Sequence, residues 1–312
     1  MAKRVVISGA TGFIGRALCR ELYGDYEIVA LSRDATRAAG LIGEYARILE
    51  WDARTASIWA AQVEGAQAVI NLAGENIGQG RWTQAKMDSL VQSRTNGAAA
   101  IVDAVAGVRN KPSVVIHGSA VGYYGSRGDE ILNEDSLPGS TFLADVCRRA
   151  ESIVTRVEKG GVRYATIRSG VVLGLHGGAL PRLMMPLRFF LGGYIGSGKQ
   201  WLSWISLADE VRAIRFVVEN PNLRGALNVT SPHPVTMRQF VRVLGRVLHR
   251  PAWTRVPGFA ARLAMGQMAD EVLLASQRVI PKRLIDAGFE FRHPELENAL
   301  EAIIQGEDHE SE

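Results

Sequence analysis

The sequence predicts an α/β protein with a doubly wound parallel sheet, and three observations carry this prediction. Short runs rich in β-branched residues, such as VVIS, AVINL and SVVIHGS, alternate with helical segments through the first 170 residues. These runs are apolar throughout, which is typical of strands that are buried on both faces of a sheet. A glycine-rich turn separates the first run from the first helix, and such turns lie at the ligand-binding edge of these sheets.

The elements follow in order along the chain. The expected strands are Arg4–Ser8, Glu27–Ser32, Arg47–Glu50, Ala68–Leu72, Val114–Gly118 and Arg163–Arg168. The expected helices between them are Gly12–Leu22, Ser57–Val63, Gln84–Val105 and Leu143–Lys159. A glycine-rich stretch over residues 170–205 comes next, followed by a helix over residues 206–220, the short strand ALNVTS, and then helices and loops. Because no linker or internal repeat separates the two parts, we expect a second lobe that is interleaved with the first.

The composition is that of a soluble globular protein, with 47% hydrophobic and 22% charged residues. The net charge of +4 comes from 36 basic and 32 acidic residues without a run of five like charges, which argues against a nucleic-acid partner. The two cysteines, Cys19 and Cys147, give neither a disulfide framework nor a metal-ligand spacing. No apolar stretch approaches the length of about 20 residues that spans a membrane. We therefore expect a cytoplasmic protein, monomeric or homodimeric, without a metal site or a membrane partner.

The glycine turn predicts a site for the diphosphate of a dinucleotide. Gly9, Gly12 and Gly15 recur at three-residue spacing directly after the first strand, and Thr11, Phe13 and Ile14 complete the turn. The first glycine allows a tight turn, the second a close approach of backbone N–H groups to an anion, and the third close packing of the helix. The alternative is a structural turn that happens to be rich in glycine.

The end of the second strand favours NADP(H) over NAD(H). A free ribose 2′-hydroxyl favours an acidic residue there, but this chain has Ser32 and Arg33, the latter 18 residues after Gly15. A guanidinium forms paired, charge-assisted hydrogen bonds with phosphate and therefore suits a 2′-phosphate. Alternatively, Arg33 is a solvated surface residue and Asp34 binds the ribose.

Further cofactor contacts are expected at the ends of later strands. Asp52, after the third strand, is placed to accept a hydrogen bond from the adenine amino group, and Leu72, Ala73 and Gly74 end the fourth strand against the cofactor. Arg94 lies on the next helix, beside the cofactor; Arg94 and Asn96 are also candidates for holding substrate or a water molecule.

The chain resembles the extended and atypical short-chain dehydrogenases/reductases, and more closely the YfcH-type epimerase-family proteins (NAD-dependent epimerase/dehydratase-like). The resemblance covers nearly the whole chain, through TGFIG, NLAGENI, RWT, SRTNG, SAVGYYG, FLADVCRRAE, RSGVVLGLHGGAL, GGYIGSGKQWLSWIS, NVTSPHPVT and QRVIPKRLIDAGFEF. It implies a Rossmann-like sheet of about seven strands, an NADP(H) cleft and a smaller C-terminal lobe. We expect an NADP-binding domain over residues 1–168 and about 206–230, a substrate lobe over about 169–205 and 231–303, and a disordered tail over 304–312.

The resemblance also implies a catalytic Tyr and Lys four residues apart, which supply the proton that accompanies hydride transfer. In this chain those positions hold Leu143 and Cys147, and Ala120 takes the usual Ser position with Ser119 one residue earlier. The remaining catalytic candidates are Ser119, Tyr123, Tyr124 and Cys147. The alternative for Cys147 is a buried, inert thiol, and His117 is either a core histidine or a base. Arg168 ends a strand and is a further candidate to face the cleft.

Substrate contacts are expected from Asn76, Gln200, Trp201 and Trp204, because aromatic walls with a few polar groups suit a small organic ligand. Alternatively, the two tryptophans are core between the lobes, and the stretch LMMPLRFFL is packing or a lid.

Two functions remain open. One is an NADP(H)-dependent oxidoreductase or epimerase that acts on a small carbonyl or sugar-like substrate. The other is a catalytically silent NADP(H)-binding module that acts through a partner, for example in cell or organelle division.

Overall fold

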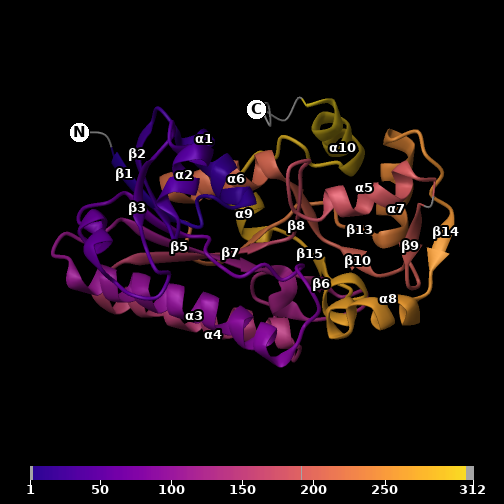
Figure 1. Ribbon diagram of the computed structural model, residues 1–312, viewed down its shortest axis with the longest axis horizontal. Helices are drawn as coiled ribbons and strands as arrows, with labels where there is room; N and C mark the ends of the chain where they lie inside the picture. The colour runs from indigo at the N-terminus through magenta and orange to yellow at the C-terminus, as the bar shows by residue number, and fades with distance from the viewer. Residues whose placement is uncertain (1–2, 191, 307–312) are drawn as a thin grey trace.

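The computed structural model describes residues 3–190 and 192–306 and contains a seven-stranded sheet in the order β12-β7-β5-β4-β1-β2-β3 (Figure 1). All neighbouring strands in this sheet run parallel. The strands are β1 Lys3–Ser8, β2 Tyr26–Ser32, β3 Arg47–Glu50, β4 Ala68–Asn71, β5 Val114–Ala120, β7 Arg163–Ser169 and β12 Gly225–Val229. The fold class predicted from the sequence is therefore confirmed, and each expected strand differs from the observed one by two residues or fewer at either end.

The sheet is covered on both faces, because successive side chains of its strands point to opposite sides. Val5 and Ile7 of β1 pack in one core, together with residues of helices α1 and α6. Val6 packs in a second core on the other face, against helix α3. Burial on both faces explains why these strands are apolar throughout and do not alternate with polar residues.

Among residues 3–190 and 192–306, five α-helices and three 3₁₀ turns belong to this sheet domain. They are α1 Phe13–Leu22, α2 Ala35–Ile42, η1 Ile58–Val63, α3 Gln84–Gly107, η2 Val121–Tyr124, α4 Phe142–Val154, η3 Thr155–Gly160 and α6 Leu207–Glu219. The expected helix Ser57–Val63 is a 3₁₀ turn, and the expected helix Leu143–Lys159 is divided into α4 and η3. Helix α2 was not predicted because it buries only Ala38 and Ile42, which is too weak a pattern to recognise.

A second lobe follows β7 and is interleaved with the sheet domain (Figure 1). One of its strands, β6 Ile131–Leu132, comes from the loop between η2 and α4. Its other elements are β8 Val171–Leu173, α5 Leu180–Arg188, β9 Gly193–Ile195, β10 Trp201–Leu202, β11 Trp204–Ser206, β13 Val235–Thr236, α7 Met237–Val247, β14 Thr254–Val256, α8 Gly258–Met265, η4 Ala269–Leu273, β15 Arg278–Val279, α9 Lys282–Asp286 and α10 Leu296–Gln305. The core of this lobe is formed by residues such as Trp204, Phe240 and Leu300.

Two expectations concern the stretch LMMPLRFFL and the C-terminal tail. Within LMMPLRFFL, Met184 and Leu187 pack in the core, whereas Met185, Phe189 and Phe190 are exposed. The expected disordered tail began at residue 304, but residues 304 and 305 belong to α10, and residues 307–312 lie outside the described residues. None of the helices described is both long and apolar enough to cross a membrane.

A buried carboxyl group lies at the first turn of α6. The Glu210 side chain is fully buried, and its Oε1 accepts a hydrogen bond of 2.6 Å from the Ser169 hydroxyl. Its Oε2 has no hydrogen-bond partner among the described residues. Burial raises the pKa of Glu210 from 4.5 to about 8.

This raised pKa predicts that the free energy of unfolding falls as pH rises from 4.5 to about 8. The folded protein retains the Glu210 proton where the unfolded chain releases it, so the contribution is complete below pH 4.5 and is lost as pH rises to about 8. We expect Glu210→Gln, which keeps the shape without the titrating group, to raise the melting temperature at about pH 8.5 by at least about 4 °C. Thermal melts at about pH 5 and about pH 8.5 test this. Equal pH dependence in both proteins would contradict the assignment.

Candidate functional site

The glycine turn is formed as a tight cradle between β1 and α1. Gly9 has a φ of +72°, and a Cβ there would lie 2.6 Å from the carbonyl carbon of Leu72. A Cβ on Gly15 would lie 2.2 Å from the Gly9 oxygen. Gly12 is the exposed N-cap of α1, with extended backbone and no capping side chain. The first-turn N–H groups and the positive end of the helix dipole therefore remain available to an anion.

A cavity of about 370 Å³ lies at the ends of β2 and β3 and against α3. It is lined by Arg33, Asp52, Ala53, Arg54, Glu75, Ser89, Gln92, Ser93 and Asn96. Arg33 and Arg54 therefore line one cavity together with the acidic Asp52 and Glu75, and the two guanidinium groups suit a phosphate group. The sequence analysis missed Arg54, although its place two residues after Asp52 is the signal that could have found it.

The acidic and hydroxyl groups near this cavity are partly engaged in local turns. The Asp34 carboxylate caps α2 by accepting a hydrogen bond of 2.9 Å from the Arg37 N–H, which leaves it less suited to bind a ribose. The Ser32 hydroxyl donates to the Asp34 carbonyl at 3.0 Å. Asp52 accepts hydrogen bonds from Thr55 and Arg54, and these lower the pKa of its carboxyl group.

A buried polar network positions the loop that follows β4. The Asn71 Oδ1 accepts hydrogen bonds from the Ser8 hydroxyl at 2.6 Å and the Ala73 N–H at 3.2 Å, while its Nδ2 lies 3.2 Å from His117 Nδ1. Burial, and then the positive charge of Arg94, lower the pKa of His117 to about 4. His117 is therefore neutral near pH 7 and lies in the core, as the packing interpretation predicts.

Arg94 reaches from α3 to the end of β4. A Cβ on Gly74 would lie 3.3 Å from Arg94 Cζ, so the guanidinium packs closely over this glycine. The Arg94 Nη1 donates to the Leu90 carbonyl at 3.2 Å. In the part of the chain that the structure describes, no carboxylate lies within 4.0 Å of Arg94.

The positions of the usual Tyr and Lys both face the protein interior. The side chains of Leu143 and Cys147 are buried, and the Cys147 Sγ lies 3.9 Å from the Ala120 carbonyl oxygen. Burial raises the pKa of the Cys147 thiol, which keeps it protonated. This placement favours the inert-thiol interpretation.

The other catalytic candidates belong to a buried network around an ion pair. Arg168 Nη2 and Nε donate to the two Glu151 oxygens at 2.8 and 3.1 Å, and the Ser119 hydroxyl donates to Glu151 Oε1 at 2.7 Å. The Arg168 guanidinium stacks on the Tyr123 ring, 3.4 Å from its centroid. Arg168 therefore contributes to packing and charge pairing at the end of β7.

Tyr124 is locked into the same network. Its side chain is fully buried, and its hydroxyl accepts a hydrogen bond of 3.0 Å from Arg168 Nη1 and donates one of 2.7 Å to Asn228 Oδ1. Burial raises the pKa of Tyr124 to about 12. Tyr124 is thus poorly placed to exchange a proton with a substrate, whereas the half-buried Ser119 and Tyr123 are less enclosed.

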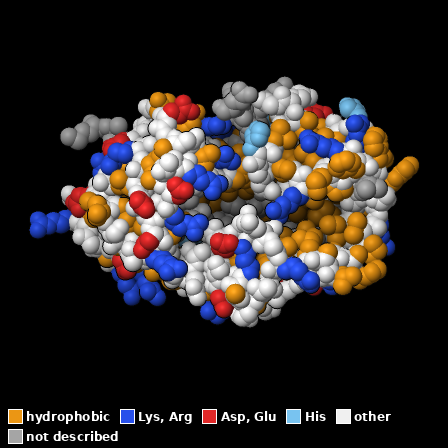
Figure 2. All heavy atoms as spheres, in the orientation of Figure 1, with side chains coloured by type: hydrophobic (Ala, Val, Ile, Leu, Met, Phe, Trp, Pro, Cys, Tyr) orange, Lys and Arg blue, Asp and Glu red, His pale blue; other side chains and the backbone are white. Residues whose placement is uncertain are grey.

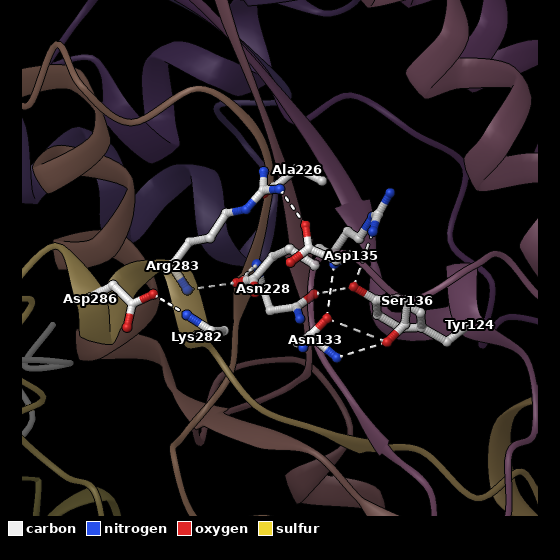
Figure 3. Close-up of polar contacts among 11 residues, drawn as sticks. Tyr124, Asn133, Asp135, Ser136, Ala226, Asn228, Lys282, Arg283 and Asp286 are labelled. Atoms are coloured by element: carbon white, nitrogen blue, oxygen red, sulfur yellow. Dashed lines mark hydrogen bonds and ion pairs between the residues drawn. The ribbon is translucent and has the colours of Figure 1, made fainter.

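The network continues from Tyr124 to the C-terminal part of the chain (Figure 3). Asn228 donates through Nδ2 to the Ile280 carbonyl, and its N–H donates to Glu134 Oε1 at 3.1 Å. Arg283 binds the Ala226 carbonyl at 3.0 Å and Asp135 at 2.8 Å. These contacts join β12 to the loop near β6 and to α9, over sequence separations that no local pattern could reveal.

None of the four substrate candidates lines the cavity beside Arg33. Trp204 is fully buried and donates through Nε1 to the His233 carbonyl, which matches the core interpretation. The buried Gln200 donates to the Ile195 and Leu273 carbonyls. Trp201 is half-buried and donates to Asp129 at 2.8 Å, while Asn76 is exposed and accepts from the Gly78 N–H.

Figure 2 shows a hollow between the sheet domain and the second lobe, with Lys and Arg side chains at its rim.

The comparisons with known proteins agree with the fold and with the motifs. The family model of the NAD dependent epimerase/dehydratase family matches residues 5–229, and that of a domain of unknown function matches residues 256–303. An epimerase family protein of Mycobacterium leprae is 38% identical over 296 residues, covering 95% of this chain and 94% of that protein. The chloroplastic SDR39U1 homolog of Arabidopsis thaliana, also an epimerase family protein, is 38% identical over 306 residues, covering 96% and 86%.

Solved structures of other proteins are also similar to this chain. The crystal structure of human epimerase family protein SDR39U1 (isoform 2) with NADPH has a TM-score of 0.87 at 30% identity and covers 97% of this chain and 99% of that one. UDP-glucuronic acid 4-epimerase of Bacillus cereus has a TM-score of 0.77 at 16% identity, covering 97% and 98%, and shares the fold. The resemblance stated from the sequence is confirmed: the chain belongs to the NAD dependent epimerase/dehydratase family.

Proposed function

We propose that the protein binds NADP(H) along the carboxyl edge of its sheet and uses it for hydride transfer. The observation that carries the proposal is the glycine turn, whose backbone lies against Leu72 so closely that a Cβ on Gly9 has no room. A diphosphate fits this turn and the N-terminus of α1. Arg33 and Arg54 line the cavity at the ends of β2 and β3, and their guanidinium groups suit the 2′-phosphate. The related human protein crystallised with NADPH gives independent support.

The proposed reaction is that of an oxidoreductase or epimerase-like enzyme with a small carbonyl or sugar-like substrate. With Leu143 and Cys147 buried in place of the usual pair, the proton must come from another group. Ser119 and Tyr123 are the candidates that remain, because both are only partly buried and both lie at the end of β5, where ligands bind in such sheets.

The test of this reaction is a turnover experiment with the purified protein loaded with NADPH. Oxidation of NADPH is followed by its absorbance with a panel of aldehydes, ketones and nucleotide-linked keto sugars. The proposal expects NADPH consumption with at least one of them, and expects Tyr123→Phe or Ser119→Ala to slow that reaction by about 100-fold or more, as loss of a general acid does. Absence of turnover over the whole panel would contradict an oxidoreductase.

A second candidate function is a silent NADP(H)-binding module, and one observation favours it. Leu143, Cys147 and Tyr124 are all buried, so three positions near the usual proton donor offer no accessible acid or base. Under this alternative, NADPH binds without being consumed, and the bound form recognises a partner. Tight NADPH binding with no turnover, together with a partner retained only in the presence of NADPH, would favour the module.

Arg33 and Arg54 provide a specific prediction about the cofactor. Replacing both by Ala removes two charged donors from one phosphate site, each worth about 1.5–3 kcal/mol. We expect the double variant to bind NADPH at least about 30-fold more weakly and to bind NADH unchanged. Calorimetric titrations of both cofactors measure this, and Arg37→Ala serves as a control, since Arg37 does not line the cavity. An equal loss of NADPH and NADH affinity would contradict the assignment of the 2′-phosphate.

A further inference from the structure

We propose that Arg94 gives the nicotinamide end of the site one uncompensated positive charge, and that the protein therefore binds NADPH more tightly than NADP⁺. This inference rests on the proposed function, because it requires that the dinucleotide binds at the glycine turn. It adds that the site prefers one redox state of the cofactor, and it attributes this preference to the side chain of Arg94.

The sheet order places Arg94 toward the nicotinamide half of the site. The adenine-side residues Arg33 and Arg54 follow β2 and β3, whereas β4, β5 and β7 lie on the other side of β1. In a doubly wound sheet, the dinucleotide crosses the edge at this switch point. The guanidinium of Arg94 lies over Gly74, at the end of β4, and acts electrostatically on Cys147, whose Sγ lies against the end of β5.

The other charged groups around this end are neutralised. Arg168 is paired with Glu151 through two hydrogen bonds, and Glu75 is paired with Lys86 at 2.5 Å. The titratable groups nearby are neutral near pH 7 as well. Burial keeps the Cys147 thiol and the Glu210 carboxyl protonated and keeps His117 uncharged.

Glu75 also acts electrostatically on Arg94, but it is paired with Lys86, so Arg94 has no ion-pair partner of its own among the described residues. Its only hydrogen bond there is to the Leu90 carbonyl of its own helix, and no carboxylate lies within ion-pair distance. A largely buried charge without a partner is costly. The structure retains it at the place where the cofactor is expected, which suggests that a ligand interacts with it.

The two redox states differ in the charge that faces Arg94. The oxidised nicotinamide ring carries a formal positive charge and the reduced ring carries none, while the phosphate charges are the same in both. At an effective dielectric constant of about 20–40, a second positive charge about 7 Å away lowers affinity by about 10-fold or more. We therefore expect wild-type protein to bind NADPH about 10-fold more tightly than NADP⁺.

The test is to measure dissociation constants for NADPH and NADP⁺ by calorimetry in wild type and three variants. Arg94→Gln removes the charge and should reduce the affinity ratio to about two-fold or less, whereas Arg94→Lys retains the charge and should retain most of the ratio. Arg33→Ala is the matched control: it lies near the phosphate common to both forms, so it should weaken both and leave the ratio unchanged. Circular dichroism melts establish that each variant is folded.

The outcomes separate this inference from the proposed function. If wild type binds NADP⁺ as tightly as NADPH, or if Arg94→Gln leaves the ratio of the two affinities unchanged, the inference about Arg94 is wrong. The proposed dinucleotide site is not contradicted by either result. If neither dinucleotide binds, the proposed function itself fails. Should Arg94→Gln not fold, the wild-type ratio and the Arg94→Lys ratio still decide the inference.

Discussion

Replacing Glu151 by Ala should lower the free energy of unfolding by about 3–5 kcal/mol. The substitution leaves the Arg168 guanidinium buried without its carboxylate, since the Arg168 side chain is only 5% exposed. It also removes the acceptor of the Ser119 hydroxyl. Urea denaturation, followed by circular dichroism, measures the change.

Two further variants make this prediction specific. Asp145→Ala breaks surface ion pairs with the exposed Arg148 and Arg149, so it should cost no more than about 1 kcal/mol. The double variant Glu151→Leu with Arg168→Met removes both charges and should recover most of the loss, because it leaves no buried charge unpaired. A cost for Glu151→Ala as small as that for Asp145→Ala would show that the pair is hydrated and does not organise the end of β5.

Replacing Gly12 by Asp should abolish dinucleotide binding while leaving the fold intact. Gly12 has a φ of −74° and an exposed position, and a Cβ there would contact only the Gly9 oxygen, at 3.1 Å. Asp is a favourable N-cap residue, so the free energy of unfolding should stay the same or rise by a few tenths of a kcal/mol, up to about 1. Its carboxylate would occupy the diphosphate site and repel the ligand, and NADPH affinity should fall at least about 100-fold.

The opposite effects on stability and binding make Gly12→Asp diagnostic. Calorimetry measures NADPH affinity, and thermal melts measure stability. Gly15→Ala is the contrasting variant: a Cβ there lies 2.2 Å from the Gly9 oxygen, so it should destabilise the protein through packing. Retained NADPH affinity in Gly12→Asp would mean that the diphosphate lies elsewhere.

The parallel sheet was predictable because its strands are continuous apolar runs, and burial on both faces leaves few alternatives. Gly9, Gly12 and Gly15 were equally recognisable from their spacing, and a side chain at Gly9 or Gly15 would collide with neighbouring backbone. Helix α2 was missed because its buried face has only Ala38 and Ile42. Local pattern therefore predicted those elements whose residues are constrained by burial or by backbone geometry.

The polar part of the site was less predictable, because its partners are distant in sequence. Tyr124 lies 104 residues from Asn228, its hydrogen-bond acceptor. Similarly, the full burial of Trp204 depends on the second lobe, and the structure places Arg54 and Arg33 in the lining of one cavity although 21 residues separate them. Sequence indicated which residue types lie near the strand ends, and the tertiary packing determined which of them face the cavity.

A calorimetric titration of the wild-type protein with NADPH and with NADH tests the central claim most directly. The account predicts saturable binding of NADPH and at least about 10-fold weaker binding of NADH, because only NADPH carries the 2′-phosphate that we propose Arg33 and Arg54 bind. Absence of heat with both dinucleotides, or NADH binding as tight as that of NADPH, would contradict it.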